Sequence, residues 1–227
     1  MKHNVQLLRK QAGFTLVEIA IVLVIIGLLL GGVLKGQEMI ENARIKAVVG
    51  DMNGIATAYA SYVDRYRAVP GDEAAITMNN RGWTGTIGGN NNGRLDSAPG
   101  TTFTNPLNDQ ASMWRALRGS GLTSGDPTAG AGAGSLPRTS SGGLMGVSVG
   151  PYGLPGIAIC VSGLTAKQAA GIEAAIDGAA VTGSGNQTGS VRGAQGAGIP
   201  VNPIPGVPPA ANFSETVVGN WTMCRSM

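Results

Sequence analysis

Apolar residues run without a charged interruption from position 19 to position 34, close to the amino end of the chain. Residues 14–34 would extend about 31 Å as a helix at ~1.5 Å per residue, which matches a hydrocarbon core of about 30 Å. Lys2, Arg9 and Lys10 precede this stretch, and such basic flanks stay on the cytoplasmic side of a membrane. We therefore predict one transmembrane helix over residues 14–34, with the rest of the chain facing outward.

Beyond this stretch, apolar and aromatic residues recur at intervals of three and four, the spacing of one face of a helix. They are Ile45, Val48, Met52, Ile55, Tyr59, Tyr62 and Tyr66. Pro70-Gly71 would then stop the helix. The pattern predicts one helix over residues 14–67, whose amphipathic half packs through these residues, the tyrosines included, against a globular head of residues 68–227.

Short apolar runs in the head, bounded by glycine and proline, predict the strands of a small antiparallel sheet. They cover residues 144–149, 156–161, 188–192 and 215–224. Thr165-Ala166-Lys167-Gln168 matches a capping box and predicts a helix over residues 166–177. Glycine-rich residues 126–143 and a proline-rich stretch from Pro200 to Pro209 are typical of surface loops. The fold class is therefore α+β.

The chain opens its apolar segment with Gly13-Phe14-Thr15-Leu16-Val17-Glu18, which places a carboxylate where lipid is expected. A carboxylate near a bilayer interior costs roughly 2.5–3.5 kcal/mol even on lenient insertion scales, and the apolar residues 19–34 offer no partner for it. An ordinary signal peptide would have a small-residue cleavage site after its apolar core. Here the small residue, Gly13, stands before the core.

This arrangement resembles the prepilin signature of type IV pilins and of the related pseudopilins of type II secretion. The resemblance rests on a short basic leader, the Gly13-Phe14 junction, a glutamate fifth after that junction and a long apolar helix. It implies a leader of residues 1–13, which a membrane prepilin peptidase removes by cleavage between Gly13 and Phe14, and methylation of the new amino terminus at Phe14. It also implies a type IV pilin-like fold.

The same resemblance places Glu18 opposite the terminal amine of a neighbouring subunit. Physical reasoning supports this role, because a carboxylate that is penalised alone is compensated by an ammonium group in a low dielectric. We therefore predict that Glu18 is an assembly contact that sets the register between subunits. The alternative is a plain single-span anchor whose glutamate lies at the level of the lipid headgroups.

The excess of positive charge disappears with the predicted leader. The chain has 16 Lys+Arg against 13 Asp+Glu, and removing Lys2, Arg9 and Lys10 leaves 13 against 13. A neutral subunit gives no electrostatic argument for nucleic acid, and no direct nucleic-acid site is evident.

Two cysteines occur, Cys160 and Cys224, both on the side of the membrane that is predicted to face outward. An even pair in an exported chain implies a disulfide, and many type IV pilins have such a bond in their carboxyl-terminal region. The alternative is two buried thiols that never meet.

Candidate chemistry is sparse in this sequence. The single histidine, His3, lies in the predicted leader, so no Ser-His, Cys-His or histidine-ligated metal site is expected in the mature chain. Asp72 and Glu73 are adjacent acids after a Pro-Gly turn, which are usually solvated. The asparagine-rich residues 90–96 are similar to a calcium loop, but Asp96 is their only carboxylate, which favours a polar turn over a metal site.

We therefore expect no enzyme, cofactor or metal, but a structural subunit of a type IV pilus that serves adhesion, twitching motility or DNA uptake. Its partners would be further copies of itself in a homopolymer, the prepilin peptidase, an inner-membrane assembly platform and, before assembly, membrane lipid. Before assembly it would cross the inner membrane once with its head in the periplasm, and afterwards it would be part of an extracellular pilus. A type II secretion pseudopilin and a membrane-tethered binding protein that never polymerises are the alternatives.

Overall fold

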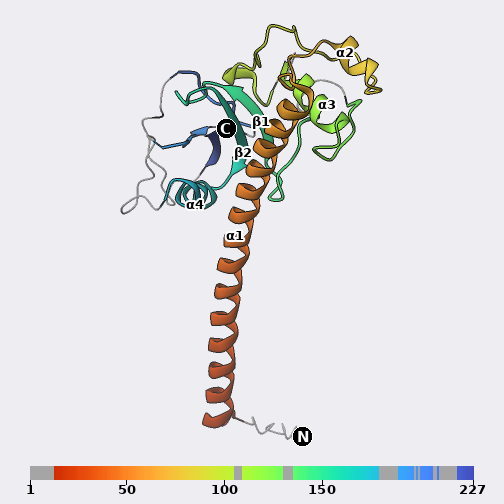
Figure 1. The fold of residues 1–227 in the computed structure, drawn as a ribbon. Helices are drawn as coiled ribbons and strands as arrows, with labels where there is room; N and C mark the ends of the chain where they lie inside the picture. The colour runs from red at the N-terminus through yellow and green to blue at the C-terminus, as the bar shows by residue number, and fades with distance from the viewer. Residues whose placement is uncertain are drawn as a thin grey trace, which may run out of the picture. The chain divides into compact units, whose positions relative to one another are not determined.

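The computed structural model describes residues 13–104, 109–129, 135–178, 189–196, 198, 200–206, 209 and 219–227. Internal contacts divide the chain into two compact units, Met1–Glu41 and Asn42–Met227. Its elements are, in chain order, α1 (Leu16–Tyr66), α2 (Ala75–Asn80), the 3-10 helix η1 (Pro99–Thr101), α3 (Asp109–Gly119), β1 (Leu144–Val149), β2 (Ile157–Leu164), α4 (Ala166–Ile176), β3 (Val191–Gly196) and β4 (Asn220–Ser226) (Figure 1).

The second half of α1 packs through a single buried stripe. Its buried residues follow the predicted spacing of three and four: Ile45, Val48, Met52, Ile55, Ala58 and Tyr62. The helix ends at Tyr66, one residue before the predicted end, and Arg67 adopts the left-handed conformation with φ 53°. Arg67 therefore turns the chain away before Pro70 is reached.

The head contains one antiparallel sheet with the strand order β1-β2-β4-β3. β1 and β2 are paired neighbours along the chain, whereas β4, the last strand, lies between β2 and β3. Helix α4 connects β2 to β3 and contacts β3 and β4 (Figure 1). The predicted α+β fold, a long amino-terminal helix packed on a small antiparallel sheet, is confirmed.

The observed strands begin or end at other residues than predicted where the pairing between strands, and not the local run of apolar residues, determines their length. β1 has the predicted bounds, but β2 continues to Leu164, because a bulge between Ser162 and Leu164 lets Leu164 pair with Trp221. β3 and β4 begin at Val191 and Asn220, later than predicted. Residues 188 and 215–218 of those predictions lie outside the described residues.

Helix α4 begins with the predicted capping box. The Thr165 hydroxyl accepts a hydrogen bond from the Gln168 backbone N–H at 3.2 Å, and the Gln168 side chain accepts one from the Thr165 N–H at 3.1 Å. The helix is confirmed and ends at Ile176, one residue earlier than predicted. Gly171 lets α4 approach α1 closely, since a Cβ atom there would lie 2.4 Å from Ile45 Cδ1.

Helix α3 was not predicted from the sequence, and its burial explains why. Residues 109 to 117 are all buried, including Asp109, Gln110, Ser112 and Arg115. Polar and charged side chains of these kinds are mostly exposed in proteins, so the sequence does not indicate a helix that is covered on every side. It adds Trp114, one of the largest fully buried side chains, to the core shared by the α1 stripe and the sheet.

Candidate functional site

The junction at the start of α1 forms a capping box. Thr15 precedes the helix, and its N–H and hydroxyl both donate to Glu18 Oε2, at 2.8 and 2.9 Å. The Glu18 N–H donates back to the Thr15 hydroxyl at 3.3 Å. This reciprocal pattern satisfies backbone donors that a helix terminus otherwise leaves unpaired.

Sequence reasoning missed this capping box, although its signal is present. Thr15-Leu16-Val17-Glu18 is a Thr-x-x-Glu sequence directly before an apolar run, which is a helix-start signature. The Glu18 carboxylate therefore has a partner in its own chain, immediately upstream of the apolar run. Among the described residues, no group donates to its second oxygen, Oε1.

The apolar part of α1 that follows Glu18 is exposed along its whole length in the single chain. Its large side chains, from Ile19 to Leu34, are between 46% and 73% exposed. By its length and composition, the helix is long and apolar enough to cross a membrane. A surface of this kind is covered in a functional setting by lipid or by other protein.

Phe14 and Gly13 lie before the helix and are both exposed. The Phe14 side chain is 84% exposed, and a Cβ atom added to Gly13 would meet no atom within 4 Å. The peptide bond predicted to be cleaved is therefore not enclosed by the described residues. The rest of the predicted leader, including Lys2, His3, Arg9 and Lys10, lies outside the described residues.

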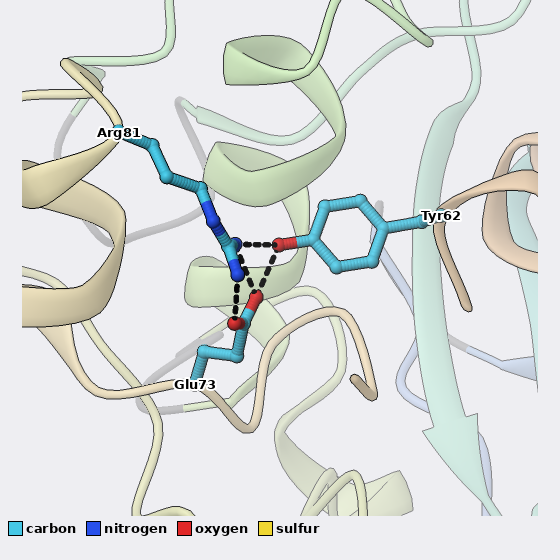
Figure 2. A network of polar contacts seen from close by, with 3 residues as sticks. All are labelled: Tyr62, Glu73 and Arg81. Atoms are coloured by element: carbon cyan, nitrogen blue, oxygen red, sulfur yellow. Dashed lines mark hydrogen bonds and ion pairs between the residues drawn. The ribbon is translucent and has the colours of Figure 1, made fainter. Parts of the chain in front are cut away.

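A buried polar network lies where the chain turns back after α1 (Figure 2). Arg81 donates to both oxygens of Glu73, at 2.8 and 2.6 Å, and to the Tyr62 hydroxyl at 3.0 Å. The Tyr62 hydroxyl in turn donates to Glu73. Burial raises the pKa of the Tyr62 hydroxyl, and the Glu73 carboxylate raises it further, so Tyr62 remains a proton donor.

Aromatic rings enclose the cation of this network. The Arg81 guanidinium lies 4.6 Å from the centre of the Tyr66 ring and 5.3 Å from that of Trp83, which are cation–π distances. Tyr66 and Trp83 meet edge to face at 5.4 Å. The network therefore ties the end of α1 to the segment that carries α2, which makes its role structural.

The expectation that Asp72 and Glu73 are solvated is wrong. Their exposed fractions are 5% and 6%, because each carboxylate is used inside the fold. Asp72 accepts hydrogen bonds from the backbone N–H groups of Asn92 and Gly93, both at 2.7 Å. The sequence alone did not reveal these partners, which lie about 20 residues away.

The asparagine-rich loop (residues 90–96) is held by its own side chains. The amide groups of Asn90 and Asn92 donate to Asp96 Oδ2 at 2.9 and 2.6 Å, and the Asp96 N–H donates to Asp109. Asparagine N–H groups face the carboxylate at the place where a calcium loop would bring oxygen atoms together. The described part of the chain contains no group of three or more His, Cys, Asp or Glu residues placed to hold a metal.

Cys160 and Cys224 form the disulfide that the sequence analysis expected. They are directly opposite each other in the β2–β4 pair, and both are fully buried. The bond fastens the carboxyl-terminal strand to the centre of the sheet.

Comparison with known proteins adds one finding about the amino end. Residues 8–34 match the family described as the prokaryotic N-terminal methylation motif. No curated protein sequence gives a significant match. The matched residues include the Gly13-Phe14 junction, the Thr15–Glu18 capping box and the apolar part of α1. The chain therefore carries the prepilin signature that type IV pilins and pseudopilins share.

Proposed function

We propose that this chain is a prepilin whose mature form is a structural subunit of a type IV pilus and polymerises through its amino-terminal helix. The observation that carries the proposal is the methylation motif, which continues directly into the exposed apolar part of α1. That combination is typical of a subunit stored in a membrane and later packed among identical helices. Lipid is then exchanged for the helices of neighbouring copies.

Processing is proposed to begin with cleavage between Gly13 and Phe14 by a prepilin peptidase. The exposure of both residues supports access of the peptidase to this bond. Methylation of Phe14 follows, and the subunit then spans the inner membrane with its head in the periplasm until an assembly platform adds it to an extracellular filament. A Gly13→Ala substitution is expected to leave the 13-residue leader attached, which mass spectrometry of the purified chain measures.

Glu18 is proposed to pair with the amino-terminal ammonium group of Phe14 in a neighbouring copy. Thr15 supplies hydrogen bonds to the carboxylate but no opposite charge. A carboxylate in a low dielectric gains far more from a nearby cation than it does in water. Pairing across subunits would therefore draw each incoming copy to one register.

A pilus is favoured over a short secretion pseudopilus by two features of the head. Its glycine-rich stretch (residues 126–143) adds surface that an outer filament wall can use for contacts. Its buried disulfide stabilises a head that faces an oxidising exterior. Adhesion, twitching motility or DNA uptake are the activities that such a filament would serve.

Electron microscopy of fibres sheared from cells, followed by peptide identification, tests the proposal. We expect peptides of this chain, beginning at a methylated Phe14, in surface fibres. Recovery only from short periplasmic fibres would favour the pseudopilin. Absence from every filament fraction would overturn polymerisation and favour a membrane-tethered binding protein.

A further inference from the structure

A cleft opens in the head beside the second half of α1. Its volume is about 290 Å³. Gly50 and Gly54 of α1 line one side, Trp114 and Arg118 of α3 lie on another, and Arg138 and Met145 complete it. All of these residues belong to the compact unit Asn42–Met227, so the cleft lies within one body.

The two glycines have no packing reason inside the chain. A Cβ atom added to Gly50 or to Gly54 would meet no other atom within 4 Å, and neither residue has a positive φ. Glycine in a helix interior lowers the stability of the helix relative to alanine. Since an alanine side chain would fit at both positions, packing within the chain does not explain why glycine is present. Gly171 of α4 is different, because a Cβ atom there would collide with Ile45. The missing side chains at Gly50 and Gly54 instead leave open space along this part of the cleft.

Arg118 brings a cation to this cleft without a carboxylate at ion-pair distance among the described residues. One of its guanidinium nitrogens donates to the Ser135 carbonyl at 2.6 Å. Burial lowers the pKa of the guanidinium, and only a longer-range attraction from Asp126 opposes this effect. A partly buried guanidinium that has no carboxylate at ion-pair distance among the described residues is suited to bind a ligand carboxylate. A guanidinium can hold a carboxylate with two parallel hydrogen bonds.

The remaining charges of the cleft leave it positive. Arg138 is a second cation, and Asp51 is the only acid among the lining residues. The Asp51 carboxylate already accepts hydrogen bonds from the Ser140 N–H and hydroxyl, at 3.0 and 3.3 Å. An anion in the cleft would therefore meet two arginines and one carboxylate that is already engaged.

Two lining residues also have unmet hydrogen-bonding capacity. Trp114 is only 1% exposed, and its indole N–H has no partner in the described part of the chain. The Thr123 hydroxyl is buried and likewise lacks a partner there. Native proteins normally pair such groups with protein, water or ligand.

We propose that this cleft is a binding site for a small organic carboxylate with an apolar body. Arg118 would hold the carboxylate, and the apolar part would contact Ile55, Trp114 and Met145, which line the cleft together with Gly50 and Gly54. At ~30 Å³ per water molecule the cleft holds the volume of roughly ten waters, so the ligand is the size of one amino acid or one small ring compound. The proposal does not depend on polymerisation.

Phenylacetate and its neutral counterpart phenylacetamide are the probes that test the charge requirement. Isothermal titration of the full-length chain in detergent micelles should show one phenylacetate site, with phenylacetamide at least about tenfold weaker. Equal affinity for the two compounds, or no heat with either, would overturn the proposal.

Substitutions at the residues that line the cleft separate an effect on binding from an effect on folding. Gly54→Ala fills part of the cleft and should weaken phenylacetate binding about tenfold, while it raises the thermal midpoint because alanine favours the helix. Gly36→Ala is the matched control, since it adds the same methyl group to α1 in open surroundings outside the cleft. Arg118→Met should abolish the preference for phenylacetate over phenylacetamide. Unchanged binding in Gly54→Ala, or a retained preference in Arg118→Met, would sink the proposed site.

Discussion

At the scale of single residues, Glu18 combines two tasks that substitutions can separate. Its carboxylate closes the capping box with Thr15, which needs only a hydrogen-bond acceptor. The proposed contact with a neighbouring amino terminus needs a negative charge as well. Glutamine satisfies the first requirement and fails the second, because Glu and Gln both serve at the third helical position of a capping box.

We predict that Glu18→Gln keeps the helix start but loses the advantage in assembly. Its share in filaments should fall about tenfold or more in competition with the wild-type protein, since losing one charge-assisted contact costs roughly 1.5–3 kcal/mol. Mass spectrometry of filaments from cells that express both forms measures the ratio. Thr15→Val is the control, because it removes the hydroxyl of the capping box, keeps the charge and should still enter filaments. Incorporation of Glu18→Gln at wild-type levels would refute the assembly contact.

Tyr62 provides a second test at this scale, inside the head. Tyr62→Phe removes the hydroxyl that bonds to Glu73 and Arg81 while it keeps the ring contact with Tyr66. We expect the free energy of unfolding to fall by about 1.5–3 kcal/mol, the usual value for a hydrogen bond to a charged group. Urea denaturation followed by tryptophan fluorescence measures it. Tyr59→Phe is the control, because the described residues give its hydroxyl no hydrogen bond.

At the scale of elements, the first residue of α3 links the helix to the asparagine-rich loop. Asp109 Oδ2 accepts the Asp96 N–H at 2.8 Å, while Oδ1 is buried without a partner among the described residues. Burial raises the pKa of the Asp109 carboxyl above its usual value of 3.8; the backbone hydrogen bond from Asp96 opposes this, while the negative charges of Asp96 and Asp72 add to it. The folded chain therefore holds the Asp109 proton more tightly than the unfolded chain does.

The sign of the resulting pH dependence follows from this raised pKa. The stability that Asp109 contributes is complete below its unfolded pKa of about 4 and is lost as the pH rises through the folded value. We predict that the wild-type protein loses free energy of unfolding relative to Asp109→Asn as the pH rises above about 4. Urea titrations across that range measure the difference. Asp96 and Asp126, whose pKa values are lowered, act oppositely but are present in both proteins. A difference that grows as the pH falls would contradict the assignment.

At the scale of the whole molecule, the disulfide joins the end of the chain to the middle of the head. Cys160 and Cys224 are separated by 64 residues, and the bond lies in the central β2–β4 pair. In the loop-entropy treatment, a closure of this length stabilises the folded state by about 4 kcal/mol. The closed loop includes α4 and β3.

Removing both sulfurs should therefore lower the stability of the head more than any surface change. We predict that Cys160→Ala with Cys224→Ala lowers the free energy of unfolding by about 4 kcal/mol. Chemical denaturation of the oxidised protein and of the double variant measures the loss. The control is wild-type protein that is purified with its disulfide formed and then exposed to excess reductant under native conditions. Because the disulfide is fully buried, it should react with the reductant only after the sheet opens. Equal stability of the variant and the oxidised protein would contradict the prediction.

Periodicity and capping made helices α1 and α4 readable in advance, and short apolar runs indicated the strands, whereas α2 and α3 were not predicted. The three-and-four spacing from Ile45 to Tyr66 gave the amphipathic half of α1, and the Thr165–Gln168 capping box gave the start of α4. Helix α3 was not predicted, and its buried polar residues, among them Asp109, Gln110 and Arg115, show that only the tertiary structure places it in the core. The capping box of Thr15 and Glu18 is also encoded locally, by a Thr-x-x-Glu sequence directly before the apolar run.

The sequence by itself determined the prepilin signature, because the basic residues before Gly13, the Gly13-Phe14 junction and the apolar helix are contiguous and local. Only the tertiary structure decided which polar residues are buried. Asp72 and Glu73 looked solvated, yet their partners come from Asn92, Gly93, Arg81 and Tyr62, which folding brings to them. The cleft beside Gly50 and Gly54 likewise forms only when folding brings residues of α1, α3 and β1 together. Local sequence patterns encode where a helix begins and whether it is apolar enough to cross a membrane. Hydrogen bonds between residues far apart in the chain depend on tertiary packing, which a single stretch of sequence does not specify.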